Sequence, residues 1–193
     1  MSEQELLERC RKGNVEAFEQ LIEAYQGKIL NYCFRMLGNR SDAEDAAQEV
    51  FVKVYRFIGS FTGQSSFSTW LYKVASNVCF DILRKRKRRG GESLSLQQYT
   101  AEGEEFDLPL EDDSYSPDRS FQRTEAQRVL KEALDKLSPE HRRVIILRDI
   151  EGLSYEEIAG IVGTAAGTVK SRINRARQIL QKLLENNREL FLS

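Results

Sequence analysis

The stretch LSYEEIAGIVGTAAGTVKSRINRARQILQKLL, residues 153–184, has the pattern of two helices joined by a tight turn. Ser154 and Glu157 have the spacing of a capping box, in which a hydroxyl and a carboxylate bind free backbone N–H groups at the start of a helix. Gly163 marks the end of that helix, because glycine adopts the left-handed conformation without a steric penalty. Thr164 is then placed to cap a second helix.

The second predicted helix has a narrow apolar edge and an opposite basic edge. The apolar positions recur at steps of three and four residues: Val169, Ile173, Ala176 and Leu180. The other edge carries hydrogen-bonding or cationic side chains: Thr168, Lys170, Ser171, Asn174, Arg175 and Arg177. A short helix, a glycine turn and a helix of this kind form a helix-turn-helix, whose second helix enters the DNA major groove. The pattern favours a DNA-reading helix, and the alternative is a helical hairpin with a solvated basic face.

The run LSYEEIAGIVGTAAGTVKSRINRAR closely resembles the C-terminal promoter-reading domain of bacterial sigma factors of the extracytoplasmic-function (ECF) group, in the sigma-70 family. Residues 167–172, GTVKSR, match the most recognisable run of that group. The resemblance implies that the basic edge reads the upstream promoter element. Activators of other families carry similar helix-turn-helices, so the rest of the chain has to decide between them.

The composition places few limits on function. A chain of 193 residues forms one ordinary domain or two small ones, and a net charge of -1 predicts neither nucleic-acid nor membrane binding. No apolar run is long enough to span a bilayer, and the charged N-terminus MSEQELLERC does not resemble a signal peptide. We expect a cytoplasmic protein that does not insert into membranes.

The three cysteines, Cys10, Cys33 and Cys79, are odd in number, widely spaced and flanked by helical patterns. These features are typical of reduced core thiols. Because His141 is the only histidine, a zinc site lacks nitrogen ligands, and we expect no metal and no cofactor.

The N-terminal part of the chain has the periodicity of a helical bundle. Residues 3–12 form a short predicted helix that ends at Gly13. Asn14 then caps a long predicted helix, in which apolar residues keep a period of 3.6 up to Gly38.

Ser41 and Glu44 form a second predicted capping box. The alternation from Val50 to Tyr55 permits a strand, but the cap and the apolar spacing favour a helix. Residues 42–56, DAEDAAQEVFVKVYR, resemble the sigma-factor segment that docks on the clamp coiled coil of RNA polymerase. The resemblance assigns the exposed side of this helix to core polymerase: Asp45, Gln48, Glu49, Val52 and Arg56.

A fourth predicted helix follows the serine- and glycine-rich loop at residues 59–68. Its far side exposes Lys73, Asn77, Phe80 and Arg84, and cations interleaved with an amide and an aromatic ring suit single-stranded nucleic acid. The alternative is a helix that packs Phe80 against a neighbour and leaves the charges in water.

Residues 67–89, FSTWLYKVASNVCFDILRKRKRR, resemble the sigma-factor region that opens and reads the downstream promoter element. The match implies that Asn77 and the loop before Trp70 face the non-template strand, where a flipped base occupies a pocket. Trp70 itself is expected in the core, so the chain departs from housekeeping sigma factors, which carry paired aromatic melting residues here. The resemblance to the ECF group implies weaker intrinsic melting and stricter promoters. The cationic run at residues 84–89 continues this face, which favours phosphate binding.

Residues 90–120 are acidic, begin with Gly-Gly and include two prolines, as expected of a flexible linker. Fully extended, it spans roughly 100 Å, so the flanking domains need not touch. Beyond it, Ser138 and Pro139 start a predicted helix, and residues 144–147, VIIL, read better as helix than as strand.

The sequence therefore predicts an all-α protein of two small helical domains, residues 1–89 and 121–193, joined by a flexible acidic linker. The resemblance implies a sigma factor whose partners are core RNA polymerase and promoter DNA, with an anti-sigma factor as a further candidate and no catalytic role. Two alternatives remain: an autonomous helix-turn-helix regulator, normally a dimer, and a serine recombinase, which requires a strand-rich catalytic domain.

Overall fold

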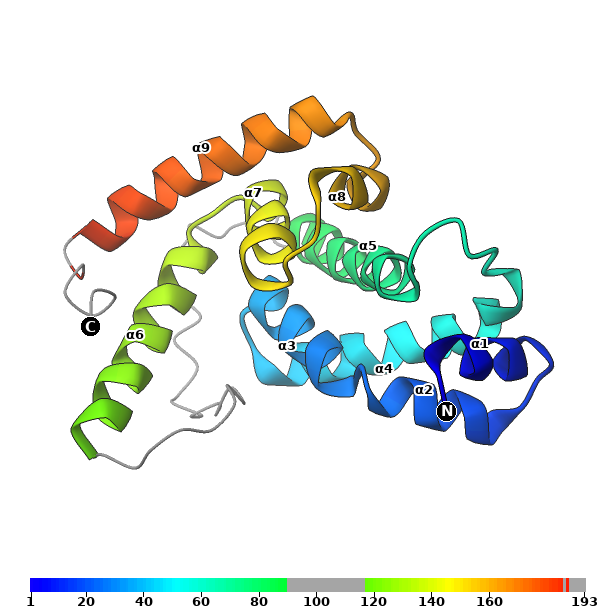
Figure 1. Ribbon diagram of the computed structural model, residues 1–193. Helices are drawn as coiled ribbons and strands as arrows, with labels where there is room; N and C mark the ends of the chain where they lie inside the picture. Colours follow the sequence, from blue (N-terminus) through cyan, green and yellow to red (C-terminus); the bar gives the residue numbers. More distant parts are fainter. Residues whose placement is uncertain (90–116, 186, 188–193) are drawn as a thin grey trace.

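The computed structural model describes residues 1–89, 117–185 and 187, and every regular element within them is helical (Figure 1). The all-α prediction is confirmed. The elements are α1 (Glu3–Arg11), α2 (Val15–Glu23), α3 (Gln26–Leu37), α4 (Arg40–Phe57), the 3-10 turn η1 (Ile58–Ser60), α5 (Phe67–Arg89), α6 (Pro117–Asp135), α7 (Pro139–Ile145), the π-helical turn η2 (Ile146–Ile150), α8 (Tyr155–Val162) and α9 (Ala166–Leu184).

The first half of the molecule, α1 to α5, is a bundle in which α3, α4 and α5 pack together and α1 and α2 lie at one end (Figure 1). Its centre consists of apolar side chains that are wholly buried, among them Ile29, Met36, Val50 and Leu71. The amphipathic periods seen in the sequence supply these positions.

The single long helix predicted after Asn14 is wrong, because the chain forms two helices there. Asn14 does cap α2, its Oδ1 accepting from the Ala17 N–H at 2.7 Å. The helix ends at Glu23, and α3 begins after Tyr25, whose ring packs edge-on against Phe67 at 5.3 Å. An apolar period that continues across a short break does not reveal the break, since the contact that holds Tyr25 comes from α5.

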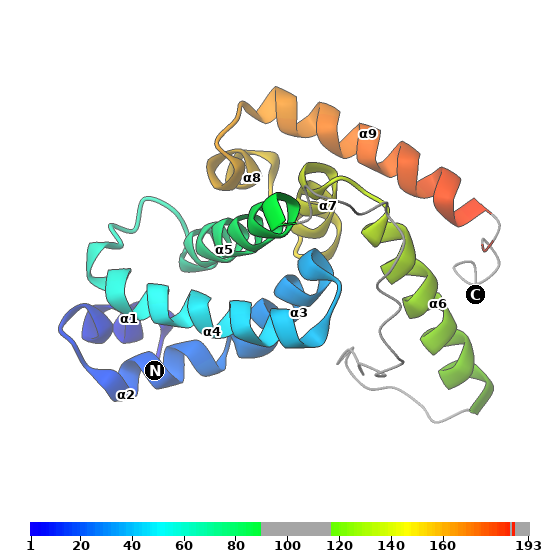
Figure 2. The same cartoon turned by 180° about the vertical axis from the view of Figure 1, so that it is seen from behind.

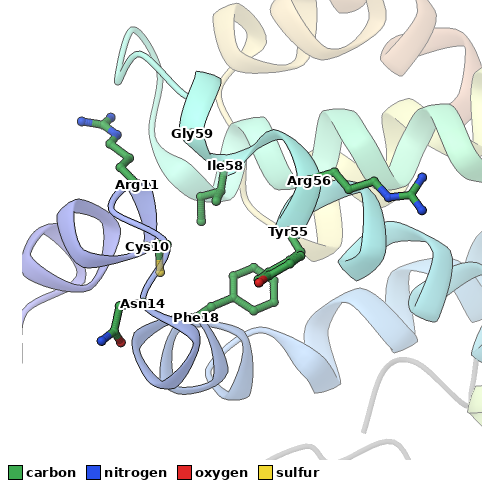
Figure 3. Close-up of a pocket in the computed structure, with 9 residues that line it drawn as sticks. Cys10, Arg11, Asn14, Phe18, Tyr55, Arg56, Ile58 and Gly59 are labelled. Carbon is green, nitrogen blue, oxygen red and sulfur yellow. The ribbon is translucent and has the colours of Figure 1, made fainter.

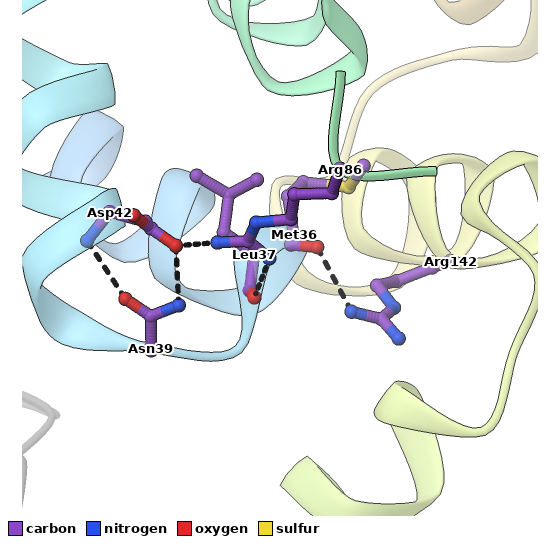
Figure 4. Close-up of polar contacts among 6 residues, drawn as sticks. All are labelled: Met36, Leu37, Asn39, Asp42, Arg86 and Arg142. Carbon is purple, nitrogen blue, oxygen red and sulfur yellow. Dashed lines mark hydrogen bonds and ion pairs between the residues drawn. The ribbon is translucent and has the colours of Figure 1, made fainter. Parts of the chain in front are cut away.

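The predicted cap of α4 is also wrong. Asn39, rather than Ser41, caps this helix, accepting at 2.8 Å from the Asp42 N–H through Oδ1. Figure 4 shows Asp42 also paired with Arg86, which donates to the Leu37 carbonyl at 3.1 Å. The cationic end of α5 is thus helical and attached to the turn between α3 and α4. The choice of helix over strand for this segment is confirmed.

In the second half, α6 to α9, the capping box of α8 is confirmed. The Ser154 hydroxyl accepts from the Glu157 N–H at 3.2 Å, the Glu157 carboxylate accepts from the Ser154 N–H at 2.9 Å, and Gly163 ends the helix at φ 71°. Thr164 does not cap α9, because the N-cap position is Ala165 and the Thr164 hydroxyl is buried without a hydrogen-bond partner among the described residues.

The two halves pack against each other, with α7 and α8 resting on α5 and on the end of α3 (Figures 1 and 2). Buried residues of both halves form one continuous apolar cluster. Most of the predicted linker, residues 90–116, lies outside the described residues. Helix α6 already begins at Pro117, a few residues before the predicted start of the second domain.

Within the described ranges, no helix is both long and apolar enough to cross a membrane. Those ranges also contain no group of three or more His, Cys, Asp and Glu side chains arranged for a metal ion. Cys10, Cys33 and Cys79 are buried free thiols. A hydrogen bond with Cys33, together with burial, raises the pKa of Cys79, which keeps this thiol protonated and unreactive.

Candidate nucleic-acid interface

The basic edge of α9 is open to solvent along its length. Val169, Ile173 and Ala176 are wholly buried and anchor the helix on α7 and α8. The predicted DNA-binding side chains are all exposed: Thr168, Lys170, Ser171, Asn174, Arg175 and Arg177. The narrow apolar edge therefore leaves the wide polar face free to enter a groove.

Two of these side chains already have partners within the protein. The Ser171 hydroxyl donates to the Thr168 carbonyl at 2.9 Å. The Arg177 guanidinium donates hydrogen bonds to both carboxylate oxygens of Asp149, with Nε at 3.0 Å from Oδ2. The hydrogen bond with Asp149 raises the pKa of Arg177. Arg177 thus ties α9 to the turn after α7, in addition to any contact with DNA.

The predicted DNA-binding side chains of α5 differ in their exposure. Lys73, Asn77 and Arg84 are exposed, and Arg84 lies 3.6 Å from Asp81. Phe80 is half-buried, with the guanidinium of Arg143 at 4.0 Å from its ring centroid. The structure places Phe80 against a neighbour, which is the alternative that the sequence left open.

The start of α5 is held by an aromatic cluster. Phe61 and Phe67 are buried, and Trp70 packs on them with centroid distances of 5.3 and 5.9 Å. The Ser66 hydroxyl accepts from the Thr69 N–H at 3.1 Å, so Ser66 caps the start of α5. This cluster fixes the loop before Trp70 relative to α5.

The outer face of α4 is exposed at every predicted polymerase-binding position: Asp45, Gln48, Glu49, Val52 and Arg56. Tyr55, which the sequence reading did not select, lies on the same face and is 51% exposed. Its ring packs edge-on against Phe18 at 5.0 Å. Its spacing of three residues from Val52 was the available signal, because such residues share a helix face.

A shallow pocket of about 320 Å³ opens beside the end of this face (Figure 3). Its walls include Phe18 and Tyr55, and Arg11 and Arg56 lie at its edge. Arg11 is already engaged, because it donates to the Phe61 carbonyl at 2.6 Å. The pocket belongs to the α4 face rather than to either predicted DNA face.

Arg142, Arg143 and Glu151 were also missed. All three lie where the second half meets α3 and α5, and the two arginines are less than one tenth exposed. Two adjacent arginines directly before the apolar run VIIL were a sequence signal for burial of cations. No local pattern indicates which surface buries them.

Two family models match the chain. The Sigma-70 region 2 model covers residues 21–89, which hold α3, α4 and α5, and the Sigma-70 region 4 model covers residues 127–180, which hold the helix-turn-helix. The chain is 40% identical to the RNA polymerase sigma-H factor of Pseudomonas aeruginosa over 95% of this chain and 94% of that protein. It is 36% identical to the ECF RNA polymerase sigma factor SigW of Bacillus subtilis over 93% and 95% of the two chains.

Solved structures show the same arrangement of helices. The sigma factor RpoE, in complex with the anti-sigma factor NepR from Bartonella quintana, aligns with a TM-score of 0.68 and 29% identity over 87% of this chain and 96% of that one. CnrH, in complex with the cytosolic domain of CnrY, aligns with a TM-score of 0.66 and 27% identity over 94% and 96%. With both family regions matched and relatives aligned over nearly their full length, the chain belongs to the ECF group of sigma-70 family RNA polymerase sigma factors.

Proposed function

We propose that this chain binds core RNA polymerase and directs it to start transcription at specific promoters. One observation carries the proposal: a single chain presents an open basic edge on a helix-turn-helix and a separate open face on α4. The first suits duplex DNA and the second suits a protein partner. Bond formation in the resulting complex belongs to the polymerase, and this chain supplies the selection.

In the proposed complex, α9 reads the upstream promoter element. Lys170 and Arg175 carry cations that bind guanine edges or phosphates, and Asn174 has an amide that pairs with adenine. Arg177 holds the helix in position through Asp149. Thr168 and Ser171 lie at the N-terminal end of α9, the end that usually contacts base edges in a helix-turn-helix.

The proposed role of α5 is to open and read the downstream element. Asn77 and Lys73 are exposed on it, next to the loop before Trp70. An amide can bind the edge of an unpaired base, and the cations toward the end of α5 can neutralise phosphates.

The proposed polymerase-binding surface is the outer face of α4, from Asp45 to Arg56. Exposed apolar side chains at Val52 and Tyr55 give it the mixed character of protein interfaces. An anti-sigma factor is a further proposed partner, because the similar RpoE was solved bound to one.

Run-off transcription with core polymerase and Arg175→Ala tests the proposal. At a promoter with its upstream element intact, losing one base-edge or phosphate contact should lower transcription by about tenfold, from roughly 1–3 kcal/mol of binding. Lys182→Ala is the matched control, because it removes an exposed cation about two turns further along α9. Equal transcription from intact and scrambled upstream elements would exclude the proposed role of α9. Tight duplex binding without polymerase would instead indicate an autonomous regulator.

A further inference from the structure

The loop at residues 62–66, which we call the α5 loop, lies between two buried aromatic anchors. The first anchor is Phe61, whose N–H donates to the Ile58 carbonyl at 3.1 Å. The second is Phe67, directly after the Ser66 that caps α5. Every residue of the loop itself is exposed. Its hydroxyls and its single amide can form hydrogen bonds with an unpaired base.

We propose that α1 positions the α5 loop for the single-stranded downstream element, with Arg11 and Glu3 as the positioning residues. The inference rests on the function proposed above, in which α5 and the loop before Trp70 read that element. The Sigma-70 region 2 model begins at residue 21, so α1 precedes the matched residues. The selectivity of the loop for its base then depends on a helix that does not itself touch DNA.

Helix α1 is suited to this role because its start and its inner face are fixed. A capping box joins Ser2 and Glu5, with the Ser2 N–H donating to Glu5 Oε2 at 2.9 Å. Leu6, Leu7 and Cys10 are buried in the core of the bundle. The helix packs on α2 and on η1, the turn that leads into the α5 loop (Figure 1).

Arg11, the last residue of α1, holds the first anchor. Its Nη2 donates to the Phe61 carbonyl at 2.6 Å. Its guanidinium also lies 5.6 Å from the centroid of the Phe61 ring, within the range of a cation–π contact. A Cβ at Gly63 would lie 3.9 Å from the same Nη2, so the guanidinium reaches the loop itself. Arg11 thus fixes both the backbone and the ring where the loop begins.

Glu3, in the first turn of α1, holds the second anchor through Tyr25. The Tyr25 hydroxyl donates to the Glu3 carboxylate, and the Tyr25 ring packs edge-on against Phe67 at 5.3 Å. Burial and the Glu3 carboxylate raise the pKa of Tyr25, so its hydroxyl stays protonated and remains a donor. One helix therefore supports both ends of the loop.

Trp70 connects the two anchors and provides a probe of them. Its ring centroid lies 5.3 Å from that of Phe61 and 5.9 Å from that of Phe67. The two phenylalanine rings also contact each other, at 5.9 Å. Because Trp70 is the only tryptophan in the chain, tryptophan fluorescence reports on this cluster alone.

The support matters because a short, exposed loop reads a base through directional hydrogen bonds. A loop that samples several conformations binds the base only in the competent one, and its apparent affinity falls with the population of that conformation. Attraction between cations and phosphates depends much less on the position of the loop. Loss of the Arg11 contact should therefore weaken selective binding more than non-selective binding.

The test uses holoenzyme reconstituted from core polymerase and the full-length chain, either wild type or Arg11→Ala. One labelled single-stranded oligonucleotide carries the non-template strand of a promoter identified by run-off transcription, and a second has its downstream element scrambled. Holoenzyme with Arg11→Ala should bind the first probe about fivefold more weakly, as expected for one lost hydrogen bond, and should bind the scrambled probe equally well. Acrylamide should quench Trp70 more strongly in the free variant, and affinity for core polymerase should stay the same.

The matched control is Arg9→Ala, which removes another arginine from the last turn of α1, one whose Nη1 lies 3.3 Å from the Met1 sulfur. It should match the wild type in every measurement. Arg11→Lys keeps one donor for the Phe61 carbonyl and should restore part of the selectivity. If Arg11→Ala loses helical content, Tyr25→Phe decides, because it removes only the hydroxyl that binds Glu3 and should lower selectivity in the same way.

Three results would overturn the proposal. The first is unchanged selectivity in a folded Arg11→Ala variant, whether or not the quenching of Trp70 changes. The second is an equal loss of affinity for both oligonucleotides, which would show that Arg11 itself binds a phosphate. The third is weaker binding to core polymerase, which would place Arg11 in the polymerase interface. In each case promoter-specific transcription by the wild-type holoenzyme would still support the proposed function, whereas its absence would refute that function.

Discussion

Two kinds of helix packing occur in this molecule. Within the first half, α3, α4 and α5 meet through apolar side chains that are wholly buried, such as Met36, Val50 and Leu71. Between the halves, the buried Arg143 meets the Ser76 hydroxyl and the Phe80 ring, and Glu151 meets Arg35 and the Tyr72 hydroxyl. The apolar cluster runs through both contacts. Burial alone therefore does not distinguish the two contacts, whereas the chemistry of the buried groups does.

The strongest test of this contrast is a cavity in the apolar contact. Leu71→Ala should lower the free energy of unfolding by about 2–5 kcal/mol, because Leu71 is wholly buried and close-packed neighbours fill the space only partly. Urea denaturation followed by circular dichroism measures the change. The control Val15→Ala, at a half-exposed position, should stay within about 0.5 kcal/mol of the wild type.

A loss below about 1 kcal/mol in Leu71→Ala would break the comparison, since it would mean that the first half is no better packed than the contact between the halves.

The helix caps also show how far sequence can predict this fold. Apolar periods located the helices except for the break between α2 and α3. The capping box at Ser154 and Glu157 was correct because every group in it is local. The cap of α4 was wrong because Asn39 and Ser41 are both competent caps. A contact from Arg86, far along the chain, binds Asp42 beside the cap that forms.

The candidate site was also predicted only where the contacts that form it are local. The open edge of α9 followed from its period, since Val169, Ile173 and Ala176 are buried by neighbours close in sequence. The surroundings of Phe80 did not follow, because Arg143 approaches it from the other half. Periodicity states which side of a helix is apolar, and says nothing about which distant element covers its far side.

Glu157 has two roles: it caps α8, and it accepts a hydrogen bond from Thr69 in the first half. Two variants with smaller expected effects distinguish these roles. Ser154→Ala removes a hydrogen bond within the second half and should lower the free energy of unfolding by about 1 kcal/mol, the usual value of a helix cap. Thr69→Val keeps the shape of the side chain but removes the bond between the halves, together with the contact of this hydroxyl with Ser66. It should leave the unfolding midpoint nearly unchanged and increase the radius of gyration.

Thermal unfolding and scattering of both variants provide the measurement. If Thr69→Val destabilised the fold as much as Ser154→Ala while the radius stayed constant, the bond would belong to a permanent core and the contrast between the two contacts would fail.

The smallest predicted effect is a pH dependence of closure, the state in which the two halves are in contact. Burial raises the pKa of Glu151 above its ordinary value of 4.5, although Tyr72, Arg35 and Lys28 act in the opposite direction. In the open form this carboxylate is hydrated, so between 4.5 and the raised pKa the closed form binds the extra proton. Lowering the pH through that window should therefore favour the closed form.

Protonation of Glu157 sets the lowest pH to which this trend continues. Hydrogen bonds from Ser154 and Thr69 lower the pKa of Glu157, so the stability that they give is lost once the pH falls below its ordinary range. Closure should increase modestly from neutral pH toward that range and then decrease. Scattering across a pH series tests the sign, and Glu151→Gln should flatten the first part of the curve. A radius of gyration that decreases as the pH rises would contradict this prediction. It would show that Tyr72 and Arg35 stabilise the ionised Glu151, so that the contact between the halves is a favourable ion-pair network.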